Sequence, residues 1–293
     1  MTPRADTTFI SGNERCAAWW YPADDTIEPG PVIVMAHGLS GTRRDRLGAF
    51  AERFADAGFA ALVFDHRGFG DSEGEPDLFV PARQLEDWRA AIAYARARPE
   101  VDTRRVVTFG SSMGGGNALA AAAEDLRIAA AISQVPFLDI LSQAYRGPLS
   151  VRLRTLLTAA RGGYLPAVGQ PDQPAFINAP DSEHGWRHVV AIGEDSRWRN
   201  RVSARWLLGR PFRPARDART LHCPWLVCVG EQDRVAAPGP AIRAARSAPH
   251  AELRLYPGVD HFDIYDGPAH EAFVTDQIAF LHRHVGAAQP ARR

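Results

Sequence analysis

The chain has 293 residues, of which 45% are hydrophobic and 23% charged, a composition typical of a folded globular protein with a sizeable core. Its formal net charge is zero and its pI is about 7.2, so no charge excess points to nucleic acid or an anionic membrane as a partner. The basic residues are all arginine, which excludes a Schiff-base lysine and a phosphate-binding Walker lysine.

The three cysteines, Cys16, Cys223 and Cys228, form an odd and sparse set without metal-ligand spacing. This argues against a disulfide framework or a zinc site, and we expect buried thiols that act as small hydrophobes. The first sixteen residues lack the apolar core of a signal peptide, and no apolar run is long enough to span a membrane. We therefore expect a cytoplasmic protein, a monomer or homodimer, without a membrane span.

The first thirty residues predict a β-hairpin whose turn is formed by Ser11-Gly12-Asn13. From residue 31 onward, short apolar runs alternate with segments whose apolar residues recur at helical spacing. The predicted strands cover 31–38, 60–64, 104–110 and 127–135, and the predicted helices cover 45–58, 81–98 and 113–125. Strands that are apolar throughout and alternate with helices are typical of a mostly parallel, doubly wound α/β sheet covered on both faces.

The alternation stops at residues 136–222, which carry prolines, tryptophans and many arginines but no clear strand. Two stretches, 149–163 and 198–209, have the pattern of amphipathic helices, so we expect a helical insertion packed on the carboxyl edge of the sheet. The alternation then resumes with strands at 224–230 and 251–256, helices at 239–248 and 268–285, and a loose tail. The predicted domains are a core of residues 1–135 and 223–293 and an inserted lid of residues 136–222.

Ligands of parallel sheets bind at the carboxyl ends of the strands. The strand at 104–110 leads into Gly110-Ser111-Ser112-Met113-Gly114, which fits G-x-S-x-G with Ser112 at the centre. Such a turn needs small residues two before and two after the nucleophile, and Ser111 fills only a variable position. The alternatives are a plain glycine-rich turn and a phosphate cradle, although the dinucleotide and Walker glycine patterns are absent.

Asp233 follows the strand at 224–230, and His261 follows the strand at 251–256. Together with the serine they stand in the order Ser…Asp…His at carboxyl strand ends, which predicts a catalytic triad. Each has an ordinary alternative, since an aspartate there can cap a helix and a histidine can belong to a loop. Asp139 is the reserve acid, whereas Asp260 and Asp263 lie too close to the histidine in sequence.

The strand at 31–38 leads into His37-Gly38-Leu39-Ser40-Gly41. A tetrahedral oxyanion needs two fixed N–H donors, and we expect the backbone N–H groups of Leu39 and Met113 to supply them. Gly38 lets the backbone turn toward the site. His37 could be a catalytic histidine, but we favour a role in holding this loop by hydrogen bonds.

Together with the runs 65–72 (DHRGFGDS), 230–233 (GEQD) and 258–262 (GVDHF), these motifs make the chain resemble an α/β-hydrolase-fold serine hydrolase. The resemblance spans residues 31 to about 285 and is nearest to the dienelactone-hydrolase-like and acyl-esterase branches. It implies a helical cap between core strands 6 and 7, with residues 65–72 shaping the site without a catalytic role. Dienelactone hydrolases proper use a cysteine where this chain has Ser112.

The lid is expected to set substrate choice, and His37, Phe137, Trp186 and Trp198 are the candidate substrate contacts. For each lid aromatic taken singly, packing in the lid core is favoured over substrate contact; the remaining ones are Tyr145, Tyr164, Phe176 and Trp206. Trp198-Arg199-Asn200 is a candidate polar clamp. His184 and His188 have metal-ligand spacing but no further zinc motif, so we expect a solvated lid face and no metal.

These residues predict acyl transfer to water through a covalent intermediate, with no cofactor, on a small to medium, largely apolar ester or thioester. A carbon–carbon bond hydrolase or an acyltransferase with the same triad is the alternative, and a non-catalytic ligand-binding protein is a third. Dehalogenase and epoxide hydrolase chemistry is disfavoured because those relatives use an aspartate where this chain has Ser112.

Overall fold

The computed structural model describes residues 4–23, 29–143 and 148–286. The predicted lid residue Tyr145 and residues 287–293 of the predicted tail lie outside these ranges. No helix among the described residues is long and apolar enough to cross a membrane.

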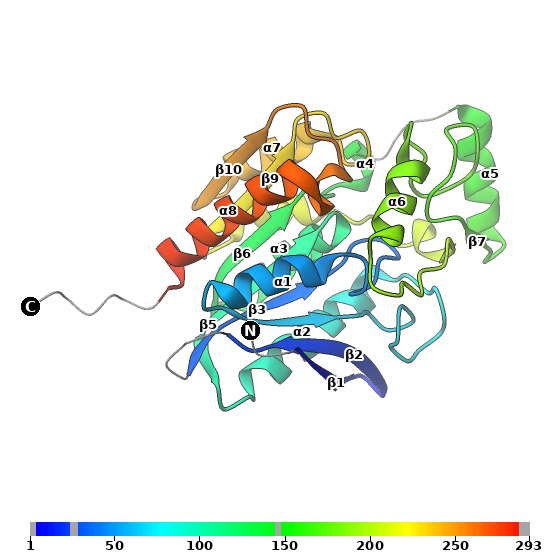
Figure 1. The fold of residues 1–293 in the computed structure, drawn as a ribbon. Helices are drawn as coiled ribbons and strands as arrows, with labels where there is room; N and C mark the ends of the chain where they lie inside the picture. The colour runs from blue at the N-terminus through cyan, green and yellow to red at the C-terminus, as the bar shows by residue number, and fades with distance from the viewer. Residues whose placement is uncertain (1–3, 24–28, 144–147, 287–293) are drawn as a thin grey trace, which may run out of the picture.

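A mostly parallel sheet of eight strands forms the centre of the molecule (Figure 1). Its strands, in the spatial order β1-β2-β4-β3-β5-β6-β9-β10, are β1 (Ala5–Ser11), β2 (Glu14–Tyr21), β4 (Ala60–Phe64), β3 (Gly30–Ala36), β5 (Val101–Ser111), β6 (Ile128–Gln134), β9 (Trp225–Gly230) and β10 (Ala251–Tyr256). β1 and β2 form the predicted hairpin, and β2 also runs antiparallel to β4, whereas the other neighbours are parallel. The predicted fold class is confirmed.

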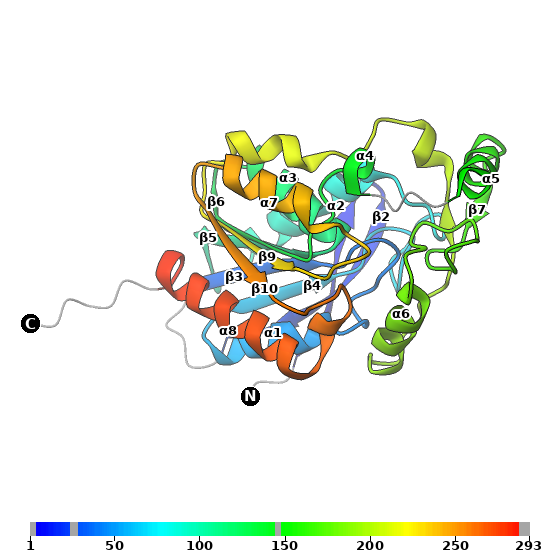
Figure 2. The same ribbon diagram turned by 90° about the horizontal axis from the view of Figure 1, so that it is seen from above.

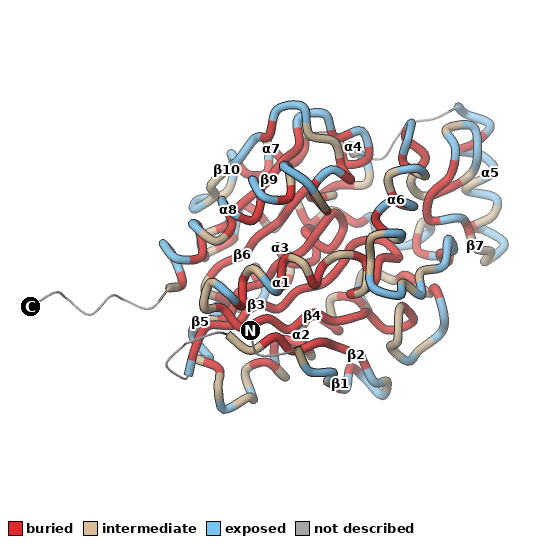
Figure 3. The backbone as a smooth tube through the Cα atoms, in the orientation of Figure 1, coloured by how far each residue is buried: buried red, intermediate tan, exposed pale blue. Residues whose placement is uncertain are grey.

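Helices cover both faces of this sheet, as seen from above in Figure 2. α1 (Leu47–Asp56) and α8 (Gly267–His284) lie on one face, and α2 (Pro81–Arg96), α3 (Met113–Glu124) and α7 (Pro238–Ser247) lie on the other. Each face has its own apolar core, and Figure 3 shows the central strands as buried. Burial on both faces explains why these strands are apolar throughout rather than alternating.

The segment between β6 and β9 has little regular structure. It contains the short strands β7 (Tyr164–Leu165) and β8 (Val202–Ser203), the helices α4 (Ile140–Gln143), α5 (Leu149–Ala160) and α6 (Ser182–Ala191), and the 3-10 helices η1 (Arg205–Leu208) and η2 (Pro214–Thr220). The predicted helix at 149–163 is present as α5. Figures 1 and 2 both show α5 and α6 at one end of the molecule, away from the central sheet.

The predicted helix at 198–209 is wrong, because this stretch is a loop followed by β8 and η1. Its side chains bind residues in separate parts of the chain, and the side chains of one helix face could not reach all of them. Trp198 Nε1 donates to Ser40 Oγ over 3.0 Å, and the Asn200 amide bonds both backbone groups of Val168 at 2.9 Å. Tertiary contacts therefore outweigh the local helical pattern.

Candidate active site

Ser112 stands on the sharp turn between β5 and α3, near the middle of the sheet. Its backbone has φ 56° and ψ −122°, in the sparsely populated region expected of a strained nucleophile turn. The Ser112 N–H donates to the carbonyl of Gln134 at the end of β6 over 3.0 Å, which anchors the turn to the neighbouring strand. The side chain projects from the N-terminus of α3, where the helix dipole favours negative charge.

The glycines that bracket Ser112 sit where no side chain fits. A Cβ atom at Gly110 would lie 2.0 Å from the carbonyl oxygen of Gly114, and one at Gly114 would lie 2.6 Å from the carbonyl oxygen of His37. The strand before the turn, the helix after it and the β3 loop thus touch backbone to backbone. This close approach explains the spacing and supports Ser112, rather than Ser111, as the centre of the motif.

Gly110→Ala is expected to destabilise the fold by about 1–3 kcal/mol or more, because the new methyl group meets backbone that cannot turn away. Urea unfolding followed by circular dichroism measures the change. Gly239→Ala in α7 is the control, since its Cβ would meet only the end of the Arg243 side chain at 3.2 Å. Equal stability of the two variants would contradict the packing described for the turn.

Ser111 is fully buried beneath the turn. Its Oγ lies 2.7 Å from the Tyr265 hydroxyl, and the Tyr265 ring in turn stacks on His37 with ring centroids 5.6 Å apart. Burial raises the pKa of Tyr265, which therefore stays protonated and able to donate. The Ser111 hydroxyl therefore contacts Tyr265, which packs on the loop residue His37, and it does not face the cavity.

Asp233 and His261 are joined by a hydrogen bond of 2.7 Å between Oδ2 and Nδ1, and both side chains are buried. The other carboxylate oxygen of Asp233 accepts the N–H groups of Val235 and Ala236 at 2.9 and 2.6 Å, which fixes the carboxylate plane. Val235 also lines the cavity that contains Ser112. Within the described residues, the Ser112 hydroxyl itself makes no hydrogen bond to His261.

The other acids considered from the sequence have different partners. Asp139, the reserve acid, forms an ion pair with Arg213 at 2.9 Å rather than with the histidine. Asp260 pairs with Arg234 at 2.5 Å, and Asp263 accepts the N–H of Asp260 over 2.8 Å. Only Asp233 is placed to orient the His261 ring.

The loop after β3 packs directly against the Ser112 turn. A Cβ atom at Gly38 would lie 3.0 Å from both Met113 N and Ser112 Cβ. Leu39 and Met113 both line the cavity, and among the described residues neither of their backbone N–H groups donates a hydrogen bond. Two unused donors therefore border the cavity on either side of the serine.

The side chain of His37 fixes this loop by a hydrogen bond to its backbone. Its Nε2 lies 2.7 Å from the carbonyl oxygen of Asp45, and its ring lies between those of Tyr265 and Trp186. Burial lowers the pKa of His37, so the ring is neutral and Nε2 donates to that carbonyl. The ring does not line the cavity, which corrects the expectation that it contacts substrate there.

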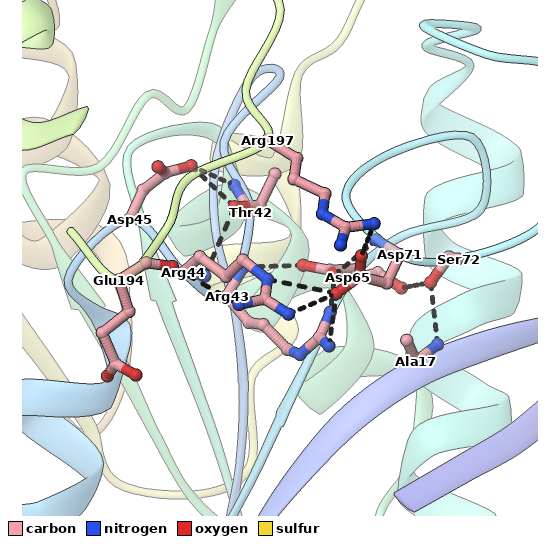
Figure 4. Close-up of polar contacts among 10 residues, drawn as sticks. All are labelled: Ala17, Thr42, Arg43, Arg44, Asp45, Asp65, Asp71, Ser72, Glu194 and Arg197. Atoms are coloured by element: carbon pink, nitrogen blue, oxygen red, sulfur yellow. Dashed lines mark hydrogen bonds and ion pairs between the residues drawn. The ribbon is translucent and has the colours of Figure 1, made fainter. Parts of the chain in front are cut away.

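The run 65–72 supports the same loop, as Figure 4 shows. Asp65 accepts the backbone N–H of Arg43 over 2.6 Å and forms a buried ion pair with its guanidinium. Asp71 forms ion pairs with Arg43 at 2.7 Å, Arg44 at 2.9 Å and Arg197 at 3.2 Å. These contacts explain the run as a brace for the loop rather than a source of reacting groups.

The cavity at Ser112 has a volume of about 50 Å³ and mostly apolar walls. Its lining residues are Leu39, Ser112, Met113, Phe137, Ile140, Phe176, Ile177, Asn178, Ala179, Trp206 and Val235. Phe137 is the one predicted substrate contact among them. Most of the others come from the irregular segment between β6 and β9, which offers no periodicity from which to predict them.

Trp186 and Trp198 do not line this cavity, contrary to expectation. Trp186 is buried against His37 and Phe262, and Trp198 packs on Trp186 with centroids 5.7 Å apart. In the predicted clamp, Arg199 pairs with Asp77 at 3.1 Å and the Trp198 and Asn200 side chains bind within the protein, so a role toward substrate stays a prediction. Their aromatic and polar character serves packing and internal contacts.

A second groove, of about 330 Å³, adjoins the cavity. It shares Ile140, Phe176, Asn178 and Trp206 with the cavity and continues along α5. His184 and His188 lie on the exposed side of α6, where His188 bonds Asp266 at 2.9 Å. The described residues contain no cluster of histidine, cysteine or acidic side chains that could hold a metal ion.

The family model of serine aminopeptidase S33, within the α/β hydrolases, matches residues 27–266. The chain belongs to this family. It is therefore an enzyme of the α/β-hydrolase fold, with a hydrolase's arrangement of sheet and helices.

Similar proteins differ in their named activities. The chain is 42% identical to the quorum-quenching protein AidA of Acinetobacter baumannii over 292 residues, covering 96% of this chain and 95% of AidA. It is 27% identical to the polyketide transferase af380 of Aspergillus fumigatus, covering 97% of each protein. The crystal structure of the α/β hydrolase GrgF from Penicillium sp. sh18 has the same fold, with a TM-score of 0.83, 24% identity and 97% and 99% coverage of the two chains.

Proposed function

We propose that the protein is a serine hydrolase that cleaves a carboxylic ester or thioester through an acyl-enzyme. Ser112 is the nucleophile, His261 the general base and Asp233 its orienting acid. The observation that carries this proposal is the strained Ser112 turn in an apolar cavity, with a hydrogen-bonded Asp–His pair at the ends of two later strands.

In the proposed reaction, His261 Nε2 takes the proton of Ser112 as Oγ attacks the acyl carbonyl. The negative charge that develops on the carbonyl oxygen is stabilised by the N–H groups of Leu39 and Met113 and by the α3 dipole. His261 then protonates the leaving alcohol or thiol. The same nitrogen next accepts a proton from water, which attacks the acyl-enzyme and releases the carboxylic acid. Asp233 stays ionised throughout and keeps the Nδ1–H tautomer.

The substrate proposed is small to medium in size and largely apolar in its acyl part. The cavity walls around Ser112 are mostly apolar, and Asn178 is the polar side chain contributed to them by the segment after β6. We propose that residues 136–222 act as a helical cap that selects the substrate, because this segment supplies Phe137, Phe176 and Trp206 to the walls. A cavity of about 50 Å³ holds only a short acyl group, so longer chains require the adjoining groove.

The name of the AidA relative suggests a diffusible signalling molecule as one substrate class for this chain. The name of the af380 relative supports the alternative, in which the same acyl-enzyme transfers its acyl group to an acceptor other than water. A carbon–carbon bond hydrolase is a further alternative with the same triad. A cytoplasmic location, and a monomeric or homodimeric state, remain part of the proposal.

The test combines labelling with turnover. A fluorophosphonate probe should label the wild type and leave Ser112→Ala unlabelled. p-Nitrophenyl esters, acyl-CoA thioesters and lactones of graded chain length then rank the substrate classes. Absence of labelling in the wild type, or equal labelling of Ser112→Ala, would refute the serine-hydrolase proposal. Labelling without turnover of any ester or thioester would favour transfer or carbon–carbon cleavage instead.

Ser111→Ala is expected to keep kcat/KM within a few fold of the wild type, because its hydroxyl bonds Tyr265 rather than facing the cavity. The unfolding free energy should fall by about 1 kcal/mol, since a buried hydrogen bond is lost. Ester kinetics and urea unfolding of the same sample measure both effects. A loss of activity as large as that of Ser112→Ala would assign the motif to the wrong serine.

A further inference from the structure

The outward side of α5 is unusually apolar. Leu149, Leu153, Leu156 and Leu157 are 67%, 53%, 50% and 54% exposed. Leu208 on η1, which packs against α5, is 59% exposed. Outside α5, η1 and α4, the other exposed large hydrophobic side chains among the described residues are Ile10, Leu126 and Leu255, which are scattered over the core. Figures 1 and 2 show α5 at the outer edge of the molecule, and Figure 3 shows much of it as exposed.

These leucines form one stripe. At about 100° per residue, positions 149, 153, 156 and 157 share a face, and the buried Val151 lies on the opposite face. Arg152 and Arg154 flank the stripe, one on each side, and the helix carries no acidic residue. The result is an outward apolar stripe between two cations, the pattern of a helix that lies in a lipid–water interface.

The charge of this part of the chain is strongly positive. Residues 136–222 contain thirteen arginines and seven acidic residues, a net charge of +6 that the remainder of the chain balances to zero. Four arginines on α5 or beside its C-terminal end, counted within the described residues, form no ion pair; they are Arg152, Arg154, Arg161 and Arg205. A net charge of zero for the whole chain therefore conceals a cationic end.

This charge distinguishes between occupants of the stripe. A second copy docked through α5 would bring arginine against arginine with no carboxylate on either helix to compensate. An anionic lipid surface satisfies both features, because acyl chains receive the leucines and headgroup phosphates attract the arginines. We propose that α5 docks the enzyme on an anionic lipid surface.

The groove along α5 lies beside this contact and not under it, because Leu156 is the one residue that belongs to both the stripe and the groove. The groove is lined by Val151, Thr155 and Leu156 of α5 and shares part of its wall with the Ser112 cavity. The docking itself is independent of the reaction that Ser112 performs.

The experiment measures binding of the full chain to vesicles of phosphatidylcholine with and without phosphatidylglycerol, by co-sedimentation. The wild type should bind the anionic vesicles, and binding should fall on raising the salt from about 0.1 to about 1 M. The double variant Leu153→Ser/Leu157→Ser should bind the anionic vesicles at least about tenfold more weakly than the wild type. Arg154→Glu should weaken binding by a similar factor. None of these three residues lines the cavity or the groove.

Matched controls are Leu126→Ser/Leu255→Ser, whose leucines are 74% and 41% exposed on the core, and Arg246→Glu on α7. Both controls should bind as the wild type does, and all variants should keep its circular dichroism spectrum. No binding of the wild type to anionic vesicles, or equal loss in the controls, overturns the proposal. A dimer seen by light scattering that only the α5 leucine variant abolishes would assign the stripe to self-association instead.

Discussion

Ser112→Ala is expected to lower kcat/KM for the best ester or thioester substrate by about 10⁴-fold or more. The variant loses the nucleophile, and only the oxyanion donors and substrate binding remain to accelerate attack by water. Steady-state kinetics with a p-nitrophenyl ester, chosen by the chain-length series, measures the loss.

The fold of this variant should be intact, because the Ser112 hydroxyl makes no hydrogen bond to another described side chain. The strained backbone of the turn is held by the surrounding strands and glycines, not by the hydroxyl. Thermal unfolding near that of the wild type is therefore the control. Residual activity within tenfold of the wild type would exclude Ser112 as the nucleophile.

Asp233→Asn is expected to lower kcat by about 10⁴-fold at neutral pH. The N–H groups of Val235 and Ala236 both point at Oδ1, so the amide oxygen of the asparagine will occupy that position. Its NH₂ group then faces His261 Nδ1 and forces that nitrogen to accept. The proton moves to Nε2, the nitrogen that has to receive the proton of Ser112.

The matching control is Asp139→Asn, which weakens the ion pair to Arg213 but leaves the His261 ring untouched. Its kcat should stay within a few fold of the wild type. The chain-length series should be run at several pH values. The activity of Asp233→Asn should recover partly at alkaline pH, where the Ser112 hydroxyl can lose its proton without a general base. Equal losses in the two variants would contradict the assignment of Asp233.

The core of the fold could be predicted from the sequence because its signals are local. Each parallel strand is an apolar run of a few residues followed by a helical pattern, and burial on both faces permits no other composition. The candidate site was equally local, since Ser112, Asp233 and His261 each stand just after a strand. The start of β5, at Val101, lies earlier than its apolar pattern predicts.

The segment between β6 and β9 was harder because its structure depends on the core. Trp198 and Arg199 gave a helical pattern, yet their partners are Ser40 and Asp77 on core loops. The cavity walls posed the same difficulty, since Phe176 and Asn178 reach Ser112 from a stretch without periodicity. No pattern within the segment specifies contacts made with residues a hundred positions away.

The residues just before β8 bear on how the site is assembled. Ser196 Oγ donates to Asp45 over 2.5 Å, Trp198 Nε1 donates to Ser40, and the Glu194 N–H donates to the Arg44 carbonyl over 2.9 Å. All three contacts end on the loop that begins with Leu39. Any displacement of this stretch would therefore loosen the loop that carries Leu39, one of the two proposed oxyanion donors. The proposed oxyanion site therefore depends on the segment between β6 and β9 as well as on the core loop that carries Leu39.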